Sequence, residues 1–103
     1  MHLYGLIILR EFAAAHPQCR GAAAAWEQEV QEAEWTTARP LQERHATAQI
    51  GSDGQVVFDL LAGPQAGLFL LGTKVRYDRG IVLVERAWLG GQPPKAATRA
   101  SKK

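Results

Sequence analysis

Two short, strongly apolar runs, residues 68–71 and 81–84, flank a charged turn. Runs of this length that are bounded by glycine and rich in β-branched and aromatic residues are typical of strands rather than helices. The turn contains Asp78 and Gly80, and glycine can adopt the positive φ that a tight hairpin turn requires. The pattern therefore predicts a buried antiparallel hairpin whose rim carries several cations and one tyrosine.

The N-terminal half shows instead the three- and four-residue spacing of helices. Residues 1–4 are compatible with a short edge strand, and residues 6–15 place their large apolar side chains on one helical face. Pro17 ends this helix and suits the first turn of the next one, which we expect over residues 17–35. A third, short helix is expected over residues 40–45, with a threonine before it as the N-cap.

The order of the predicted elements defines the fold class. Helices come first, and a strand over residues 55–61 then joins the hairpin, with glycine-containing turns on either side of it. We therefore predict an α+β domain in which N-terminal helices pack on an antiparallel β-sheet. Residues 1–90 are expected to form this single domain. Residues 91–103 lack apolar periodicity and carry four cations without an acid, which predicts a disordered basic tail.

Charge is distributed unevenly along the chain. Residues 1–73 carry four arginines and eight acidic residues, a net charge of −4, whereas residues 74–103 carry eight basic and two acidic residues, a net charge of +6. Such asymmetry indicates a polyanionic partner for the C-terminal part, most simply a nucleic acid. The alternative is a solvated basic tail that only improves solubility.

Several other function classes find little support in the composition. Cys19 is the one cysteine and has no partner for an internal disulfide, so we expect a cytoplasmic protein in which this thiol is a small helix residue rather than a nucleophile. No apolar run approaches the roughly 20 residues that cross a bilayer, and no secretory signal is recognisable. The histidines, at positions 2, 16 and 45, have no metal-ligand spacing, so no metal and no cofactor are expected.

The candidate chemistry lies in the cations and the phenol of the hairpin. Cations around a phosphate stabilise the charge that develops in phosphoryl transfer, and a phenol can transfer protons. RNA supplies its own nucleophile, the 2′-hydroxyl, so cleavage needs no metal when such groups are well placed. Arginines on strands are also common surface residues, and a tyrosine in a turn often serves only packing. The group consists of Lys74, Arg76, Tyr77, Arg79 and Arg86.

Five segments form an ordered set between residues 9 and 84: LREFAAAHP (9–17), AW (25–26), EAEW (32–35), QVVFDL (55–60) and KVRYDRGIVLV (74–84). In order and spacing this set resembles the HigB family of bacterial type II toxins, which are small ribosome-dependent mRNA interferases related to the RelE fold. The resemblance implies a cytoplasmic, metal-independent endoribonuclease that acts on mRNA on the ribosome. It also implies silencing by a small helix-turn-helix antitoxin similar to HigA.

The chain departs from the family at positions that matter for cleavage. The family usually opens one strand with Tyr-Arg, where this chain has Ala66 and Gly67, and ends its last strand with Thr-His followed by Glu-Tyr. Arg86 is within one position of the expected arginine, but no histidine or tyrosine follows it. We expect catalytic roles for Arg79, Arg86 and Tyr77, and RNA-binding roles for Lys74, Arg76, Lys95 and Arg99.

Two alternatives remain open. The chain could be a degenerate toxin that keeps the fold and acts as a module for binding an antitoxin or RNA, which the missing histidine and tyrosine favour. It could also be a general RNA-binding domain unrelated to toxins.

Overall fold

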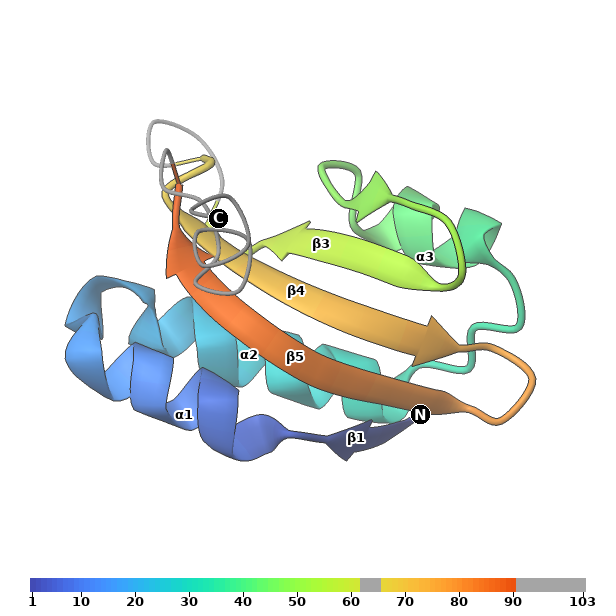
Figure 1. The fold of residues 1–103 in the computed structure, drawn as a ribbon, viewed down its shortest axis with the longest axis horizontal. Helices are drawn as coiled ribbons and strands as arrows, with labels where there is room; N and C mark the ends of the chain where they lie inside the picture. Colours follow the sequence, from blue (N-terminus) through green and yellow to red (C-terminus); the bar gives the residue numbers. More distant parts are fainter. Residues whose placement is uncertain (62–65, 91–103) are drawn as a thin grey trace, which may run out of the picture.

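The computed structural model describes residues 1–61 and 66–90, and the predicted tail, with Lys95 and Arg99, lies outside the described residues. Figure 1 shows how the described elements are arranged. In chain order they are β1 (His2–Tyr4), α1 (Leu6–Ala15), the 3-10 turn η1 (Pro17–Cys19), α2 (Arg20–Glu32), α3 (Ala38–Arg44), β2 (Gln49–Ile50), β3 (Gln55–Asp59), β4 (Phe69–Arg76) and β5 (Ile81–Leu89). The predicted α+β class is confirmed.

The sheet has five strands in the order β1-β5-β4-β3-β2, and it is mixed rather than antiparallel. The pairs β2–β3, β3–β4 and β4–β5 are antiparallel, as predicted, but β1 pairs with β5 in parallel. The prediction of a purely antiparallel sheet was wrong because β1 is not joined to its neighbour by a turn. The whole helical half of the chain separates the two strands, so no hairpin imposes their relative direction.

β1 is held at both of its ends. The ammonium group of Met1 donates hydrogen bonds to the carbonyl oxygens of Val30, Gln31 and Ala33 at 3.1, 3.1 and 2.7 Å, where the C-terminal end of α2 attracts a positive charge. Gly5 then turns the chain into α1 with a φ of 77°, and a side chain there would collide with the backbone carbonyl of Val84 on β5. β1 is therefore fixed to the C-terminal end of α2 at its start and packs closely against β5 at its end.

The predicted helices are present, with changes at their ends. The first one matches α1 residue for residue, but the second is divided into η1 and α2 and ends at Glu32. Ala33 adopts an extended conformation, which turns the chain so that Trp35 reaches the core with 7% of its surface exposed. α3 begins before Pro40, because proline is tolerated in the first turn, where its missing N–H has no acceptor within the helix.

The predicted hairpin is confirmed, and both of its strands extend beyond the apolar runs that indicated them. Gly80 adopts the expected positive φ, at 67°. The strand predicted over residues 55–61 ends two residues earlier, at Asp59, and the two-residue strand β2 was not predicted. Its side chains are exposed, so it lacks the apolar pattern by which a strand is recognised.

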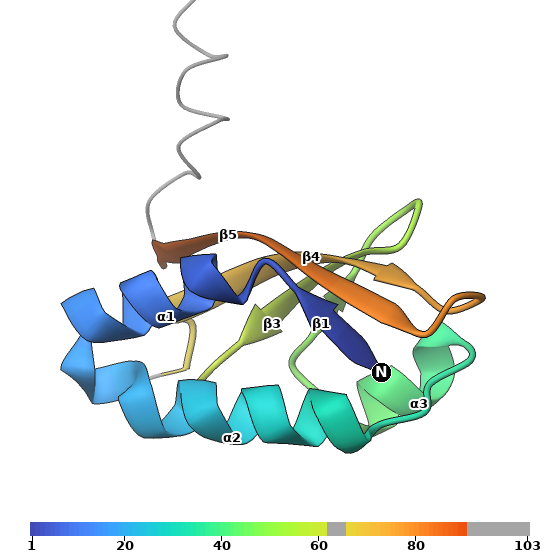
Figure 2. The ribbon, with the colours of Figure 1, turned by 90° about the horizontal axis from the view of Figure 1, so that it is seen from below.

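One face of the sheet packs against the helices, and this interface is the core (Figure 2). Trp26 of α2 meets Phe58 of β3 edge to face, with ring centroids 5.3 Å apart. Among the described residues no helix covers the opposite face, and no helix is long and apolar enough to cross a membrane. The side chains buried from the strands are Val56, Phe58, Phe69, Leu71, Thr73, Val75, Val82 and Val84.

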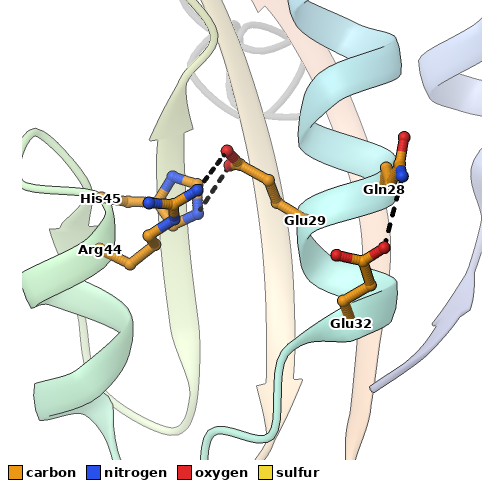
Figure 3. Close-up of polar contacts among 5 residues, drawn as sticks. All are labelled: Gln28, Glu29, Glu32, Arg44 and His45. Atoms are coloured by element: carbon orange, nitrogen blue, oxygen red, sulfur yellow. Dashed lines mark hydrogen bonds and ion pairs between the residues drawn. The ribbon is translucent and has the colours of Figure 1, made fainter.

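α3 is attached to α2 by a polar contact beside the core (Figure 3). Arg44 donates a 2.8 Å hydrogen bond to Glu29, and Nε2 of His45 lies 3.6 Å from the other carboxylate oxygen of Glu29. The His45 ring also meets Trp35 and Phe58 edge to face, at centroid distances of 5.7 and 5.2 Å. One carboxylate of α2 therefore contacts two consecutive residues at the end of α3.

Candidate nucleic-acid interface

The helix-free face of the sheet is built by the alternate residues of its strands. On β4 the buried side chains Leu71, Thr73 and Val75 point to the core, so the residues between them point to the other face. The same reasoning applies to β5 and to β1, where Tyr4 is 55% exposed. We call this surface the open face. Its residues on the three strands are His2, Tyr4, Leu70, Gly72, Lys74, Arg76, Ile81, Leu83, Arg86 and Trp88.

A β-bulge determines that Arg86 belongs to the open face. Val84 lies opposite Thr73 while Arg86 lies opposite Gly72, so Glu85 is an extra residue in β5. In a regular strand residue 86 would point to the core, as Val84 does. The extra residue reverses the alternation, which is the effect a bulge has on the strand that carries it. Arg86 therefore lies on the same face as the cations of β4.

The three cations of the open face form a line. Arg86 lies opposite Gly72, and Lys74 and Arg76 follow Gly72 on β4 at alternate positions. Arg76 is 3.6 Å from Asp78 and Arg86 is 3.8 Å from Glu85, and all four side chains are partly exposed. Pairs that are this long and this exposed contribute little binding energy, so they leave the guanidinium groups able to bind a phosphate.

Arg86 and Trp88 lie over the bare backbone of Gly72. A Cβ atom on Gly72 would be 3.1 Å from Cγ of Arg86 and 3.1 Å from Cζ3 of Trp88. The guanidinium carbon is 5.6 Å from the centroid of the Trp88 ring, within the range of a cation–π contact. The absence of a side chain at position 72 therefore leaves room for both long side chains to approach the backbone of β4.

The remaining residues that the sequence suggested lie elsewhere. Tyr77 continues the core-facing alternation of β4 and packs against the core, and its hydroxyl is buried without a hydrogen-bond partner. Burial raises the pKa of Tyr77. Arg79 is exposed in the turn beyond the sheet, and Lys95 and Arg99 are outside the described residues. The structure thus brings together Lys74, Arg76 and Arg86 on the open face. Tyr77 is not on that face, although it lines a depression at the end of β4 together with Lys74 and Arg76.

Three residues of the open face were not predicted: His2, Tyr4 and Trp88. His2 pairs with Ile81 and Tyr4 with Leu83, and these β5 residues pair in turn with Arg76 and Lys74. The imidazole and the phenol therefore lie in the same cross-strand rows as two cations, two strand spacings or about 10 Å away. Their position depends on the parallel pairing of β1 with β5, and no local sequence pattern predicts that pairing.

A polar depression of about 540 Å³ adjoins the cations at the end of β4. Lys74 and Arg76 line it from the sheet, and Thr36 lines it from the segment between α2 and α3. Asp53 and Asp78 add acidic side chains, so the depression carries both signs of charge. It extends the open face around the edge of the sheet rather than forming a separate cationic site.

Other chemistry is poorly supported by the described part of the chain. No three His, Cys, Asp or Glu side chains converge there as metal ligands would. Cys19 is 0% exposed, and burial raises the pKa of its thiol, which disfavours the reactive thiolate.

The fold and this surface define an α+β domain with one helix-free, cation-bearing sheet face. No model of a known protein family matches the chain, and no curated protein matches it either.

Proposed function

We propose that this protein is the toxin of a type II toxin–antitoxin system, a metal-independent endoribonuclease that cleaves mRNA on the ribosome. The observation that supports this best is the gathering of Lys74, Arg76 and Arg86 on a sheet face that no described helix covers. Backbone phosphates give such a surface a strong, salt-dependent attraction for RNA. The ordered motifs that resemble the HigB family supply the biological context.

In this proposal the RNA provides the nucleophile. The 2′-oxygen attacks the adjacent phosphorus, the bond from phosphorus to the 5′-oxygen breaks, and the products are a 2′,3′-cyclic phosphate and a 5′-hydroxyl. Lys74 and Arg86 stabilise the negative charge that accumulates on the phosphoryl oxygens. A base accepts the proton of the 2′-hydroxyl, and an acid protonates the leaving 5′-oxygen.

The proton-transfer groups are assigned to β1. His2 and Tyr4 carry the imidazole and the phenol of the open face, and both are exposed. We assign His2 as the base and Tyr4 as the acid, since an imidazole nitrogen can accept a proton and a phenol can donate one. Tyr77 is left out of this scheme because its hydroxyl is buried.

The test is cleavage of mRNA on translating ribosomes, with the 5′ ends of the products mapped. Arg86→Ala and Lys74→Ala should each reduce cleavage by 100-fold or more, which is of the order found for lost transition-state charge stabilisation. Arg39→Ala is the matched control, because Arg39 is an exposed arginine on α3, away from the open face. Equal activity of the Arg86, Lys74 and Arg39 variants would contradict the proposal.

A second candidate is a degenerate toxin that binds an antitoxin or RNA without cleaving it. The observation that favours it is an offset along β5. Among the described residues, the only open-face phenol and imidazole lie beside Leu83 and Ile81, whereas Arg86 lies further along the strand, beyond the bulge. Expression of the chain alone distinguishes the two. Growth arrest with cleaved mRNA supports the enzyme, and normal growth with retained RNA binding supports the degenerate form.

The proposed partner in either case is a small helix-turn-helix antitoxin similar to HigA, and the proposed location is the cytoplasm. An adjacent reading frame that encodes such a protein, and growth restored by its co-expression, would support the partnership. Failure of the product of that frame to bind this chain would contradict it.

A further inference from the structure

We propose that Trp88, Arg86 and Gly72 form a subsite on which an unpaired base of single-stranded RNA stacks. The inference rests on the proposed RNA-directed function and adds to it the residue that holds a base rather than a phosphate. It is carried by the geometry of one small area of the open face, where the Arg86 guanidinium lies over the Trp88 ring and both side chains approach the bare backbone of Gly72.

The glycine leaves room for the subsite. Gly72 has Arg86 directly opposite on β5, and a Cβ at position 72 would lie 3.1 Å from both Arg86 and Trp88. These side chains therefore occupy the space that any other residue at position 72 would fill. A partly exposed indole beside a guanidinium, on a sheet face without a covering helix, provides the aromatic surface and the charge that single-strand binding uses.

Trp88 differs from the other tryptophans of the chain. Trp26 and Trp35 are 4% and 7% exposed and belong to the core, whereas Trp88 is only partly buried and points away from it. A core role does not account for an indole on a sheet face that no described helix covers. Aromatic side chains on open sheet faces beside cations are the usual means by which proteins hold single strands.

Arg86 lies between Trp88, on which the base would stack, and the cations of β4, which would bind the phosphates. Its guanidinium carbon is 5.6 Å from the Trp88 ring centroid, and its side chain is 40% exposed. The Nε atom is buried and has no acceptor, so the exposed end of the guanidinium is the part that can meet a phosphate. Lys74 and Arg76 continue along β4 at intervals of about 7 Å. A base on Trp88 would thus direct its backbone toward these cations.

Fluorescence of the full chain tests the subsite directly. The probe is an octamer of adenosine ribonucleotides, added at constant ionic strength with excitation of tryptophan. We expect the octamer to quench the emission of Trp88 while Trp26 and Trp35 remain as a constant background, because both are in the core. Inorganic polyphosphate is the matched anionic probe, and it should bind through charge without quenching.

Three variants separate stacking from charge. Trp88→Leu should abolish the quenching and weaken octamer binding by roughly 5-fold or more, as the loss of one stacked base does. Gly72→Val should have the same effect, because it displaces Arg86 and Trp88 without removing either. Ile7→Ala is the matched control, since Ile7 is an exposed apolar residue of α1 and is not part of the open face. It should bind the octamer normally.

The outcomes are distinct for the subsite and for the nuclease. Quenching by the octamer without mRNA cleavage would support the subsite and overturn the nuclease. Cleavage that survives Trp88→Leu with unchanged octamer affinity would support the nuclease and overturn the subsite. Equal quenching by polyphosphate, or no quenching of the wild-type chain, would also overturn the subsite, whether or not the variants fold.

Discussion

Gly72 and Arg86 face each other across β4 and β5, and a bulge at Glu85 keeps the arginine on the open face although two residues separate it from the core-facing Val84 along the chain. The bulge and the glycine act together. The bulge accommodates Glu85 as an extra residue, and the glycine leaves room for the Arg86 side chain above β4. Arg86 therefore joins the cations of β4 despite the extra residue in its strand.

Deletion of Glu85 is therefore expected to be tolerated. It would convert β5 into a regular strand in which Val84 still points to the core and Arg86 still points outward. We expect cooperative urea unfolding with a free energy within about 1 kcal/mol of wild type. Deletion of Leu83 is the contrasting variant, because it makes Val82 and Val84 adjacent, so that one of these core valines must turn outward at a loss of at least about 1.5 to 3 kcal/mol. Equal damage from both deletions would argue against the bulge.

Gly5 and Gly21 should respond in opposite directions to replacement by alanine. Gly5 has a φ of 77° and a side chain there would collide with the Val84 carbonyl, so Gly5→Ala should lower the free energy of unfolding by at least about 1 to 2 kcal/mol. Gly21 lies in α2 with nothing within 4 Å of an added Cβ, so Gly21→Ala should raise it by about 0.5 to 1 kcal/mol. Thermal unfolding of the two variants measures the difference, and the same sign for both would contradict the structure at β1.

Tyr77→Phe distinguishes packing from catalysis. The Tyr77 hydroxyl is buried without a partner, and such a group costs about 1 to 3 kcal/mol. Removing it should leave the free energy of unfolding unchanged or raise it by about 1 kcal/mol, with RNA cleavage unaffected. A large loss of cleavage with normal stability would instead restore the catalytic role that the sequence suggested for this residue.

His45 should make the fold sensitive to acid. Burial lowers the pKa of His45, against the opposing effect of Glu29 and with the help of Arg44. The folded state therefore favours the neutral imidazole. The stability that His45 contributes is fully present above the unfolded pKa of about 6.5, and it is lost as the pH falls below that value. Urea unfolding at pH 7.5 and pH 5.5 should show the loss.

Two variants assign this pH dependence. His45→Phe keeps an aromatic ring beside Trp35 and Phe58 and should reduce the loss of stability between the two pH values. Glu29→Gln removes the carboxylate that favours the protonated imidazole and should increase it. An unchanged pH dependence in both variants would show that His45 is not the group responsible.

The features that were predicted correctly from the sequence are those that depend on residues close together in the chain. The bounds of α1, the hairpin and the positive φ of Gly80 all follow from residues that are close in the chain. The division of the second predicted helix was missed because Ala33 has no helix-breaking chemistry of its own. It leaves the helix so that Trp35 can be buried, and this is a tertiary effect.

The candidate site could be predicted only in part for the same reason. The cations of β4 share a face because they alternate, and this is visible in the sequence. Arg86 joins them through a bulge, and no residue type marks Glu85 as the extra one. His2 and Tyr4 lie on the open face because β1 pairs in parallel with a strand about 80 positions later in the chain. No local pattern encodes this pairing.

That pairing also has a consequence for the time at which the protein becomes active. β1 leaves the ribosome first, but its partner β5 is made last among the described elements, so the sheet completes late in synthesis. A nascent chain that stops before residue 81 lacks the strand that joins His2 and Tyr4 to the cations of β4. If the proposed nuclease is correct, the ribosome that synthesises it carries no assembled cleavage site until that strand has emerged.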